Sequence, residues 1–463
     1  IVKSGLSTNK RTLRKNMIKT YSFPESLAHS EAYKLTVAGQ TIPVFATADA
    51  HYATLEWDPK QSKSGMLDIK VHTPGHLIKT ANIRPLNKEL ACTPTGQELD
   101  FTLTKPEYLY IEIDNLPRLF LWVNAPETDK PDPNDPNVLY YEGGKHHYAG
   151  IIELQSNQTL YIEEGAVVTG CVEAYYQENV CVRGRGILDG SCYDRKLGTA
   201  RTSILFAHCK DVTCRDLIMI DPSAWMLLPG DCDGVHIHDI KQIGIVMCSD
   251  GIDITGSRNV LIENCFLRNN DDCIVIKACN KDKNAPTAKS RDFRTNVENL
   301  EVRNTTLVNA AQGNAIEIGY ELAADHVRNV QFHDIDVICV EGHGAVFSIH
   351  NGDRACVENI TYENIRIEHC YDRFIDFRVL VSRYNEDEER GSIRNLLLKN
   401  IHWHVDRFNP GSTISLIGGY DANHTADSIH FENITLGDRK IQDVDELELH
   451  TRHASDIRLL NGK

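Results

Sequence analysis

The chain has 463 residues, of which 65 are acidic and 49 basic, giving a formal net charge of −16. This length exceeds one ordinary domain of about 100–200 residues, and a hydrophobic content of 41% is too high for a disordered chain. The acidic balance argues against a nucleic-acid partner, and no apolar run reaches the roughly 18 residues that a membrane-spanning helix needs.

The first sixteen residues form a basic segment with five lysine or arginine side chains and no acidic one. No apolar segment follows, so the stretch does not resemble a signal peptide. We expect residues 1–16 to be a leader or a tag that stays disordered. The fourteen cysteines show no C-x-x-C pair and are typical of free thiols. They slightly favour a cytoplasmic location, with a secreted or periplasmic one if a signal was removed.

Residues 17–125 are predicted to form a β-sandwich. Short segments of alternating apolar and polar residues, such as 67–71, 99–103 and 108–113, are separated by Gly, Pro and Asn turns. The stretch 126–137 then contains four prolines and is predicted to be a linker.

A short repeat fills the rest of the chain, residues 138–463. Each copy begins with Asn, Asp or another small residue, followed by alternating β-branched or Leu residues, at intervals of 23 to 40 residues. The starting positions are Asn179, Asp211, Gly234, Asn259, Asn299, Asn329, Asn359, Asn395 and Ser428. Repeats of this length without a helical period predict the coils of a right-handed parallel β-helix, in which stacked coils share one core.

One coil is longer than the others, because a polar stretch with five basic residues is inserted at 280–296. Long insertions in a repeat architecture often line a binding face. We expect this loop to close one end of a groove, which would favour exo-action or short oligosaccharides.

Three aspartates are predicted to meet on two neighbouring coils. Asp250 precedes one apolar strand, and Asp271 and Asp272 precede the next, with Asp271 21 residues after Asp250. Residues one coil apart stack about 4.8 Å from each other, so these carboxylates are predicted to converge. Crowded carboxylates cannot all ionise freely, and one raised pKa beside a normal one is what glycosidic bond hydrolysis requires.

Two simpler interpretations compete with catalysis. Acidic residues at turns are often solvent-exposed and have no specific role, and a cluster of carboxylates can bind Ca²⁺. The apolar run that directly follows Asp272 places the pair at a strand edge, which favours a functional role. We expect no metal and no cofactor.

Several motifs resemble the polygalacturonase clan, glycoside hydrolase families 28 and 49. They lie at 156–166 (SNQTLYIEEGA), 184–190 (GRGILDG), 249–254 (SDGIDI) and 270–274 (NDDCI). The resemblance implies that Asp271 is the general acid, that Asp250 and Asp272 position and deprotonate water, and that the anomeric carbon is inverted.

Two departures from family 28 bear on the substrate. Asn314 stands where that family has a histidine, which is more similar to the dextranase-type family 49, as is a β-sandwich ahead of the helix. The family's Arg-Ile-Lys, which holds a uronate carboxylate, is Ser348-Ile-His350 here. Serine cannot replace a bidentate arginine contact, so a neutral sugar is favoured, unless Lys277, Arg354 or Arg378 restores the cation.

The sequence therefore predicts an all-β, two-domain inverting glycoside hydrolase acting on a neutral, dextranase-like α-glucan. Its substrate-binding candidates are Asn314, Glu317, Tyr320, His350, Lys277 and Arg354. The alternatives are a pectin-related hydrolase, a polysaccharide lyase, and a non-catalytic carbohydrate-binding β-helix. The expected partner is a carbohydrate, with no nucleic acid and no membrane, and the oligomeric state stays open.

Overall fold

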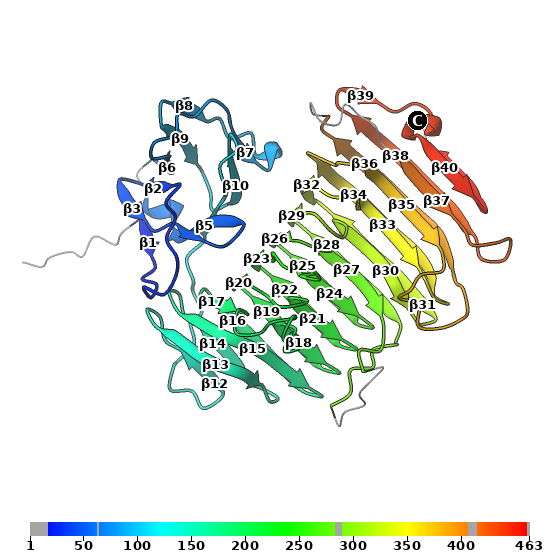
Figure 1. Cartoon of the computed structure of the whole chain (residues 1–463), viewed down its shortest axis with the longest axis horizontal. Helices are drawn as coiled ribbons and strands as arrows, with labels where there is room; N and C mark the ends of the chain where they lie inside the picture. The colour runs from blue at the N-terminus through cyan, green and yellow to red at the C-terminus, as the bar shows by residue number, and fades with distance from the viewer. Residues whose placement is uncertain (1–16, 63, 283–288, 406–413, 461–463) are drawn as a thin grey trace, which may run out of the picture.

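The computed structural model describes residues 17–62, 64–282, 289–405 and 414–460. Figure 1 shows two β units, a small one built from the N-terminal strands and a long ladder of strands that runs to the C-terminus. The predicted fold class, a β-sandwich followed by a right-handed parallel β-helix, is confirmed. The expected leader, residues 1–16, and residues 283–288 of the long insertion lie outside the described residues.

The small unit contains two sheets packed face to face. One has the strand order β1-β5-β11-β10-β7, with β4 paired to β5, and the other has the order β3-β2-β6-β9-β8. The strands are β1 (Ile18–Thr20), β2 (Lys34–Val37), β3 (Gln40–Ile42), β4 (Phe45–Ala46), β5 (Ala50–Trp57), β6 (Leu67–His72), β7 (Ala81–Arg84), β8 (Thr93–Thr95), β9 (Glu98–Leu103), β10 (Tyr108–Ile113) and β11 (Arg118–Asn124), with short 3₁₀ turns at Pro59–Gln61 and Leu86–Lys88.

The alternation seen in the sequence is what builds the sandwich core. In β6, Leu67, Ile69 and Val71 are buried while the residues between them are not, because successive side chains of a strand point to opposite faces. β9 and β10 follow the same pattern. Each sheet thus places one apolar face against the other sheet.

The long unit winds its strands into three parallel faces. The flank face contains β12 (Val138–Tyr141), β14 (Thr159–Ile162), β16 (Glu178–Gly184), β19 (Lys210–Arg215), β22 (Asp233–His238), β25 (Arg258–Glu263), β28 (Val297–Arg303), β31 (His326–His333), β34 (Cys356–Ile367), β36 (Ser392–Trp403), β38 (Ala426–Leu436) and β41 (Ala454–Leu459). The docking face contains β17 (Ile187–Asp189), β20 (Ile218–Ile220), β23 (Lys241–Ile243), β26 (Phe266–Asn269), β29 (Thr306–Asn309) and β32 (Asp336–Val340).

The third face, called the cleft face below, carries the candidate site. It contains β18 (Ile204–Ala207), β21 (Leu227–Gly230), β24 (Ile252–Thr255), β27 (Ile274–Ala278), β30 (Ile316–Leu322), β33 (Ala345–Asn351), β35 (Arg373–Val379), β37 (Ser415–Gly418) and β40 (Leu449–Arg452). β13 (His146–Glu153) and β15 (Val167–Tyr175) form the N-terminal coil, and β39 (Arg439–Lys440) and a 3₁₀ turn at Val444–Leu447 lie near the C-terminal end.

The repeat in the sequence marks one backbone position of each coil. All nine predicted starting residues have a left-handed φ between +50° and +77°, a conformation that Asn, Asp and Gly adopt most readily. From Asn259 to Asn395, the asparagine side chains of successive coils donate to one another, as from Asn299 Nδ2 to Asn259 Oδ1 at 3.2 Å. This ladder fixes the register between coils.

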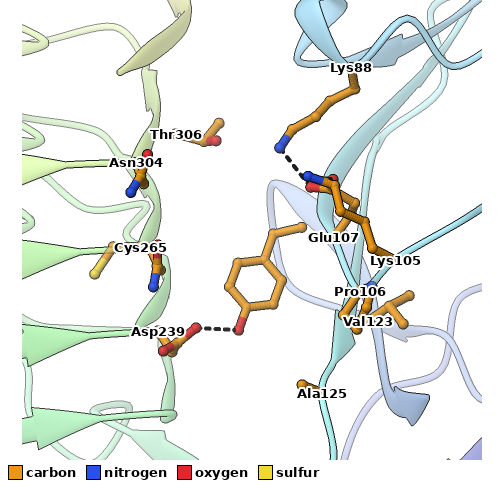
Figure 2. A pocket seen from close by; sticks show the side chains of 12 residues that line it. Lys88, Lys105, Pro106, Glu107, Val123, Ala125, Asp239, Cys265, Asn304 and Thr306 are labelled. Carbon is orange, nitrogen blue, oxygen red and sulfur yellow. Dashed lines mark hydrogen bonds and ion pairs between the residues drawn. The ribbon is translucent and has the colours of Figure 1, made fainter. Parts of the chain in front are cut away.

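The sandwich covers the docking face with an apolar contact. Phe120 and Trp122 of β11 pack on Phe266 of β26, with Phe120 and Phe266 ring centroids 5.0 Å apart. A cavity of about 330 Å³ remains between the two units, and Figure 2 shows Glu107 on its sandwich side and Asp239 on its β-helix side. The predicted linker is not loose, since Asp129 forms ion pairs with arginines of the flank face.

All fourteen cysteines are free thiols in the structure. Over the ranges that the structure describes, no helix has both the length and the apolar character needed to cross a bilayer.

Candidate active site

The three predicted aspartates are brought together on the cleft face by strand register. Ile252 of β24 pairs with Ile274 of β27, so the residues two positions earlier, Asp250 and Asp272, stack on each other. The sequence interval of 21 residues pointed to Asp271 as the stacked partner, and the register is one residue longer. Oxygens of Asp250, Asp271 and Asp272 lie within 4.8 Å of one another.

The turn that presents Asp271 is fixed by contacts within its own coil and from the coils on either side. Asn309 Nδ2 donates to the Asp271 carbonyl at 2.9 Å, and the Cys248 and Asp272 amides donate to the Asp271 carboxylate at 3.2 and 3.1 Å. Gly313 has a φ of +67°, and a Cβ there would lie 2.3 Å from the Asp272 nitrogen. The chain therefore needs a glycine at position 313 to pass so close to the carboxylates.

Burial divides the three carboxylates. Asp250 and Asp272 are only 3% and 9% exposed, whereas Asp271 is half-buried and reaches the surface of the cleft. Burial, and next the charge of Asp250, raise the pKa of Asp271 to about 6, against the opposing charge of Lys277. Burial and the nearby Glu317 raise the pKa of Asp272 well above its usual range. The cluster thus retains protons that ordinary aspartates lose.

Lys277 of β27 supplies the positive charge beneath the cluster. Its ammonium lies 2.9 Å from Asp250 Oδ2 and 3.0 Å from Asp253 Oδ1, and 3.9 Å from the centroid of the Trp225 ring. Burial alone would lower the pKa of Lys277, but the two carboxylates outweigh it and raise that pKa well above its usual range. The lysine therefore stays charged and is committed to protein carboxylates.

Asn314 joins the catalytic candidates to a second buried group. Its backbone and side-chain nitrogens donate to Asp272 Oδ1 at 2.7 and 2.9 Å, and its Nδ2 also donates to Glu317 Oε2 at 2.9 Å. Glu317, which is fully buried, lies 3.1 Å from His350 Nδ1. His350 Nε2 is in turn 3.2 Å from Asp376 Oδ2.

His350 is an imidazolium held between these two carboxylates. Burial lowers its pKa, but Glu317 and Asp376 outweigh burial and raise the pKa to about 9. Tyr320 covers the imidazole, with ring centroids 4.4 Å apart and planes 8° apart. The stacked pair forms a flat platform next to the carboxylates, of the kind that suits a sugar ring.

Arg378 and Arg354 also have carboxylate partners. Arg378 donates to Asp376 through Nε and through Nη2, the latter at 2.8 Å, and Arg373 lies 3.0 Å from the same carboxylate. Arg354 lies in the turn after β33, 3.3 Å from Asp325 and 2.7 Å from Asp387.

The structure thus gathers five of the six predicted substrate-binding residues around the carboxylates: Asn314, Glu317, Tyr320, His350 and Lys277. It places Arg354 in a separate ion-pair cluster. Sequence reasoning missed Asp376 and Asn309. Asp376 has a recognisable signal, because it shares one register column with Glu317 and Ser348.

The carboxylates of Asp250, Asp271 and Asp272 are close enough to coordinate a hard cation, for which oxygen is the preferred ligand. The Lys277 ammonium already provides a positive charge at hydrogen-bond distance from Asp250. The same geometry also puts an acid beside two buried carboxylates, an arrangement suited to acid–base chemistry.

Comparison with known proteins places this geometry in a family context. Residues 152–376 match the model of "Glycosyl hydrolases family 28". A curated polygalacturonase of Chamaecyparis obtusa is 27% identical over 196 residues, which is 40% of this chain and 32% of that protein. The match thus spans about a third of that relative's length.

Two solved structures share the fold across both units. Dex49A from Penicillium minioluteum has a TM-score of 0.67 at 14% identity and covers 96% of each chain. A family 28 exopolygalacturonase of Yersinia enterocolitica has a TM-score of 0.55 at 12% identity and covers 95% of this chain and 100% of its own. At these identities the likeness is one of fold.

Proposed function

We propose that this chain, a glycoside hydrolase of the polygalacturonase clan, cleaves a neutral poly- or oligosaccharide with inversion at the anomeric carbon. A dextranase-like α-glucan is the preferred substrate over polygalacturonate. The observation that carries the proposal is the convergence of three carboxylate groups within 4.8 Å, with a raised pKa on the exposed member, Asp271.

Asp271 is the general acid in this mechanism. Its carboxyl group is the one that reaches the cleft, and a pKa of about 6 keeps a large protonated fraction in weakly acidic solution. Its proton passes to the glycosidic oxygen as the bond from that oxygen to the anomeric carbon breaks. The departing sugar then carries a neutral hydroxyl group.

Asp250 and Asp272 hold and deprotonate the attacking water. Asp250 is ion-paired with Lys277, and Asp272 is held through one oxygen by Asn314, which leaves its other oxygen for the water. The water oxygen bonds to the anomeric carbon, and its proton goes to the member of this pair that is ionised, while the protonated member holds the water by a hydrogen bond. Exchange with solvent returns the pair and Asp271 to their starting states.

The stereochemistry rests on the burial of this pair. Inverting enzymes usually separate their carboxyl groups by about 6.5–9.5 Å and retaining enzymes by about 5–5.5 Å, so closest approaches within 4.8 Å do not favour inversion by distance alone. What supports inversion is that Asp250 and Asp272 lie below the surface that Asp271 reaches. A buried carboxylate can accept a hydrogen bond from a water molecule more easily than it can form a covalent bond to a sugar carbon.

The preference for a neutral sugar follows from the charges at the cleavage position. Lys277 and His350 are each neutralised by buried carboxylates, so neither offers an uncommitted charge to a uronate there. The carboxylate of a uronate would have to enter a region that already contains the carboxyl groups of Asp250, Asp271 and Asp272.

A pectin-related hydrolase is the alternative that the curated relatives favour, since those matched by sequence are polygalacturonases. The test is a set of digests of dextran, other neutral glycans and polygalacturonate, with proton NMR of the first anomer released. We expect turnover of a neutral glycan with an inverted product.

Three results would each overturn part of the proposal. Faster cleavage of polygalacturonate would overturn the neutral preference. A retained anomer would give Asp250 or Asp272 the role of nucleophile. Binding of glycans without any turnover would identify a carbohydrate-binding protein.

A further inference from the structure

A second hollow lies on the cleft face, beyond the catalytic carboxylates. It has a volume of about 390 Å³ and is lined by residues of β35, β37 and β40 and of the turns that follow them. In Figure 1 these strands follow β27, β30 and β33 in the same ladder toward the C-terminal end. A glycan lying along the cleft reaches both places.

Strand register shows how the hollow forms. Gly319, His350, Arg378, Gly418 and Arg452 occupy one outward column on successive strands. Gly418 has no side chain, so the space between the two arginines stays open. At 4.8 Å per strand, Arg378 lies about 14 Å and Arg452 about 24 Å from the column position on β27.

The hollow has the opposite charge to the cleavage position. Among the described residues that line it there is no Asp or Glu, although the chain as a whole carries a net charge of −16. Arg452 is exposed and makes no ion pair with any described residue. Arg378 keeps Nη1 free of protein hydrogen bonds among the described atoms, while Nε and Nη2 bind Asp376.

The other walls suit a sugar. Val381 is 62% exposed and Tyr420 43% exposed, and Leu416 forms part of the floor. Apolar and aromatic surfaces of this kind pack against the CH groups of a pyranose ring, and a free guanidinium fork binds a planar anionic group through two parallel hydrogen bonds.

We infer that this hollow is a subsite for an acidic sugar residue, bearing a carboxylate, sulfate or phosphate, at a distance of several sugar units from the bond that is cleaved. The inference rests on the proposed function, and it deepens the substrate class. The natural glycan is neutral at the cleavage position and acidic further along the chain. A uniformly neutral polymer has no anionic group to pair with the Arg452 guanidinium.

Binding of small probes tests the subsite without requiring turnover. D-glucuronate, glucose 6-sulfate, glucose 6-phosphate and D-glucose are titrated against the full chain, with saturation-transfer NMR as the readout. We expect at least one anionic probe to bind about tenfold more tightly than glucose at low salt, and the advantage to shrink in 0.5 M NaCl. The tightest probe identifies the charged substituent.

Two variants locate the effect. Arg452→Gln should abolish the preference for the anionic probe, and Leu416→Trp, which fills the hollow, should weaken all four probes. Arg458→Gln is the matched control, because Arg458 is exposed on β41 of the flank face, and this variant should keep the preference. Equal binding of the anionic probes and glucose, or a preference that survives both Arg452→Gln and Leu416→Trp, would overturn the inference.

The outcome is separable from that of the proposed function. Anionic-probe binding that depends on Arg452, in a protein that turns over no glycan, would leave the subsite standing and remove the hydrolase proposal. Turnover of a neutral glycan without such binding would support the hydrolase proposal and remove the subsite.

Discussion

The cleft face and the docking face of the β-helix bury charged groups in different ways. On the cleft face, Asp250, Asp253, Asp271 and Asp272 crowd around a single ammonium, that of Lys277. On the docking face, buried cations of the β-helix pair with carboxylates of the sandwich, as Arg268 does with Asp49 at 2.8 Å. Arg185 lies 2.9 Å from Glu56, for example.

The difference shows what each face does. Ion pairs between the two units compensate the buried charges and position the sandwich on the helix. Crowding carboxylates around one cation leaves protons bound where they are normally lost, which destabilises the fold locally and is the condition that the proposed general acid needs. Both arrangements arise from the same ladder, because stacked strands repeat outward positions in columns.

The largest effect is expected from removing the exposed acid. Asp271→Asn keeps the shape of the side chain but cannot donate the proton, so turnover should fall by about 10²–10⁴-fold while glycan binding is largely kept. Initial rates and binding titrations on the same neutral glycan measure the two quantities. Asp438→Asn, at an exposed turn after β38, is the control. Turnover within tenfold of the parent would contradict the assignment.

Removing the central cation tests the crowding itself. Lys277→Met should lower turnover by about 10²-fold and weaken the fold by about 3–5 kcal/mol, because Asp250 and Asp253 lose their partner in a buried region. Chemical denaturation and initial rates measure these effects. A variant as stable as the parent would mean that the carboxylates do not depend on the lysine.

The pH dependence of the turnover rate should follow the titration of Asp271. Since Asp271 must be protonated to act and has a pKa of about 6, the rate should fall about tenfold per pH unit above pH 6. In Lys277→Met this limb should move to higher pH, because the lysine charge lowers the pKa of Asp271. If the limb stays at the same pH in Lys277→Met, the titrating group that controls the rate is not Asp271.

Stability should respond to pH through Asp271 with a defined sign. The folded carboxyl binds its proton more tightly than the unfolded one, so the free energy of unfolding falls as pH rises from about 4 to about 6. Asp271→Asn should therefore gain stability over the parent across that interval, by about 1–3 kcal/mol. Melting temperatures of the two proteins at pH 4 and pH 7 give the comparison.

The repeat was predictable from the sequence because its cause is local. A left-handed residue at each strand start favours Asn, Asp or Gly whatever the rest of the fold does, so Asn259, Asn299 and Asn329 marked the coils. The alternation in β6 and β9 was predictable for the same reason, since one face of each strand meets the sandwich core.

Features that depend on several coils at once were not predictable. Counting residues gave Asp271 as the stacked partner of Asp250, whereas the strand pairing sets Asp272 there. Asp376 lies 59 residues after Glu317 in the sequence and still shares His350 with it. Nothing local distinguishes Lys241 from an exposed lysine, although the sandwich buries it completely.

The smallest effect is expected from Lys241 on the docking face, and it changes the free energy of unfolding with pH in the opposite direction to Asp271. Lys241 is 1% exposed, its ammonium lies 2.9 Å from Asn124 Oδ1, and burial lowers its pKa to about 8. The unfolded chain binds this proton more tightly, so Lys241 makes the free energy of unfolding rise with pH between about 8 and 10.5.

Lys241→Met should remove that rise and cost about 1–3 kcal/mol at pH 9, because the Asn124 amide oxygen loses one of its two donors and keeps only the Tyr108 hydroxyl. Turnover should stay within twofold of the parent, since the docking face is not the cleft face. Melting temperatures at pH 7.5 and 10, with Lys210→Met on the exposed flank face as the control, measure the effect. A large loss of activity in Lys241→Met would show that the sandwich contact and the cleft are coupled, and that the two faces do not divide docking from catalysis.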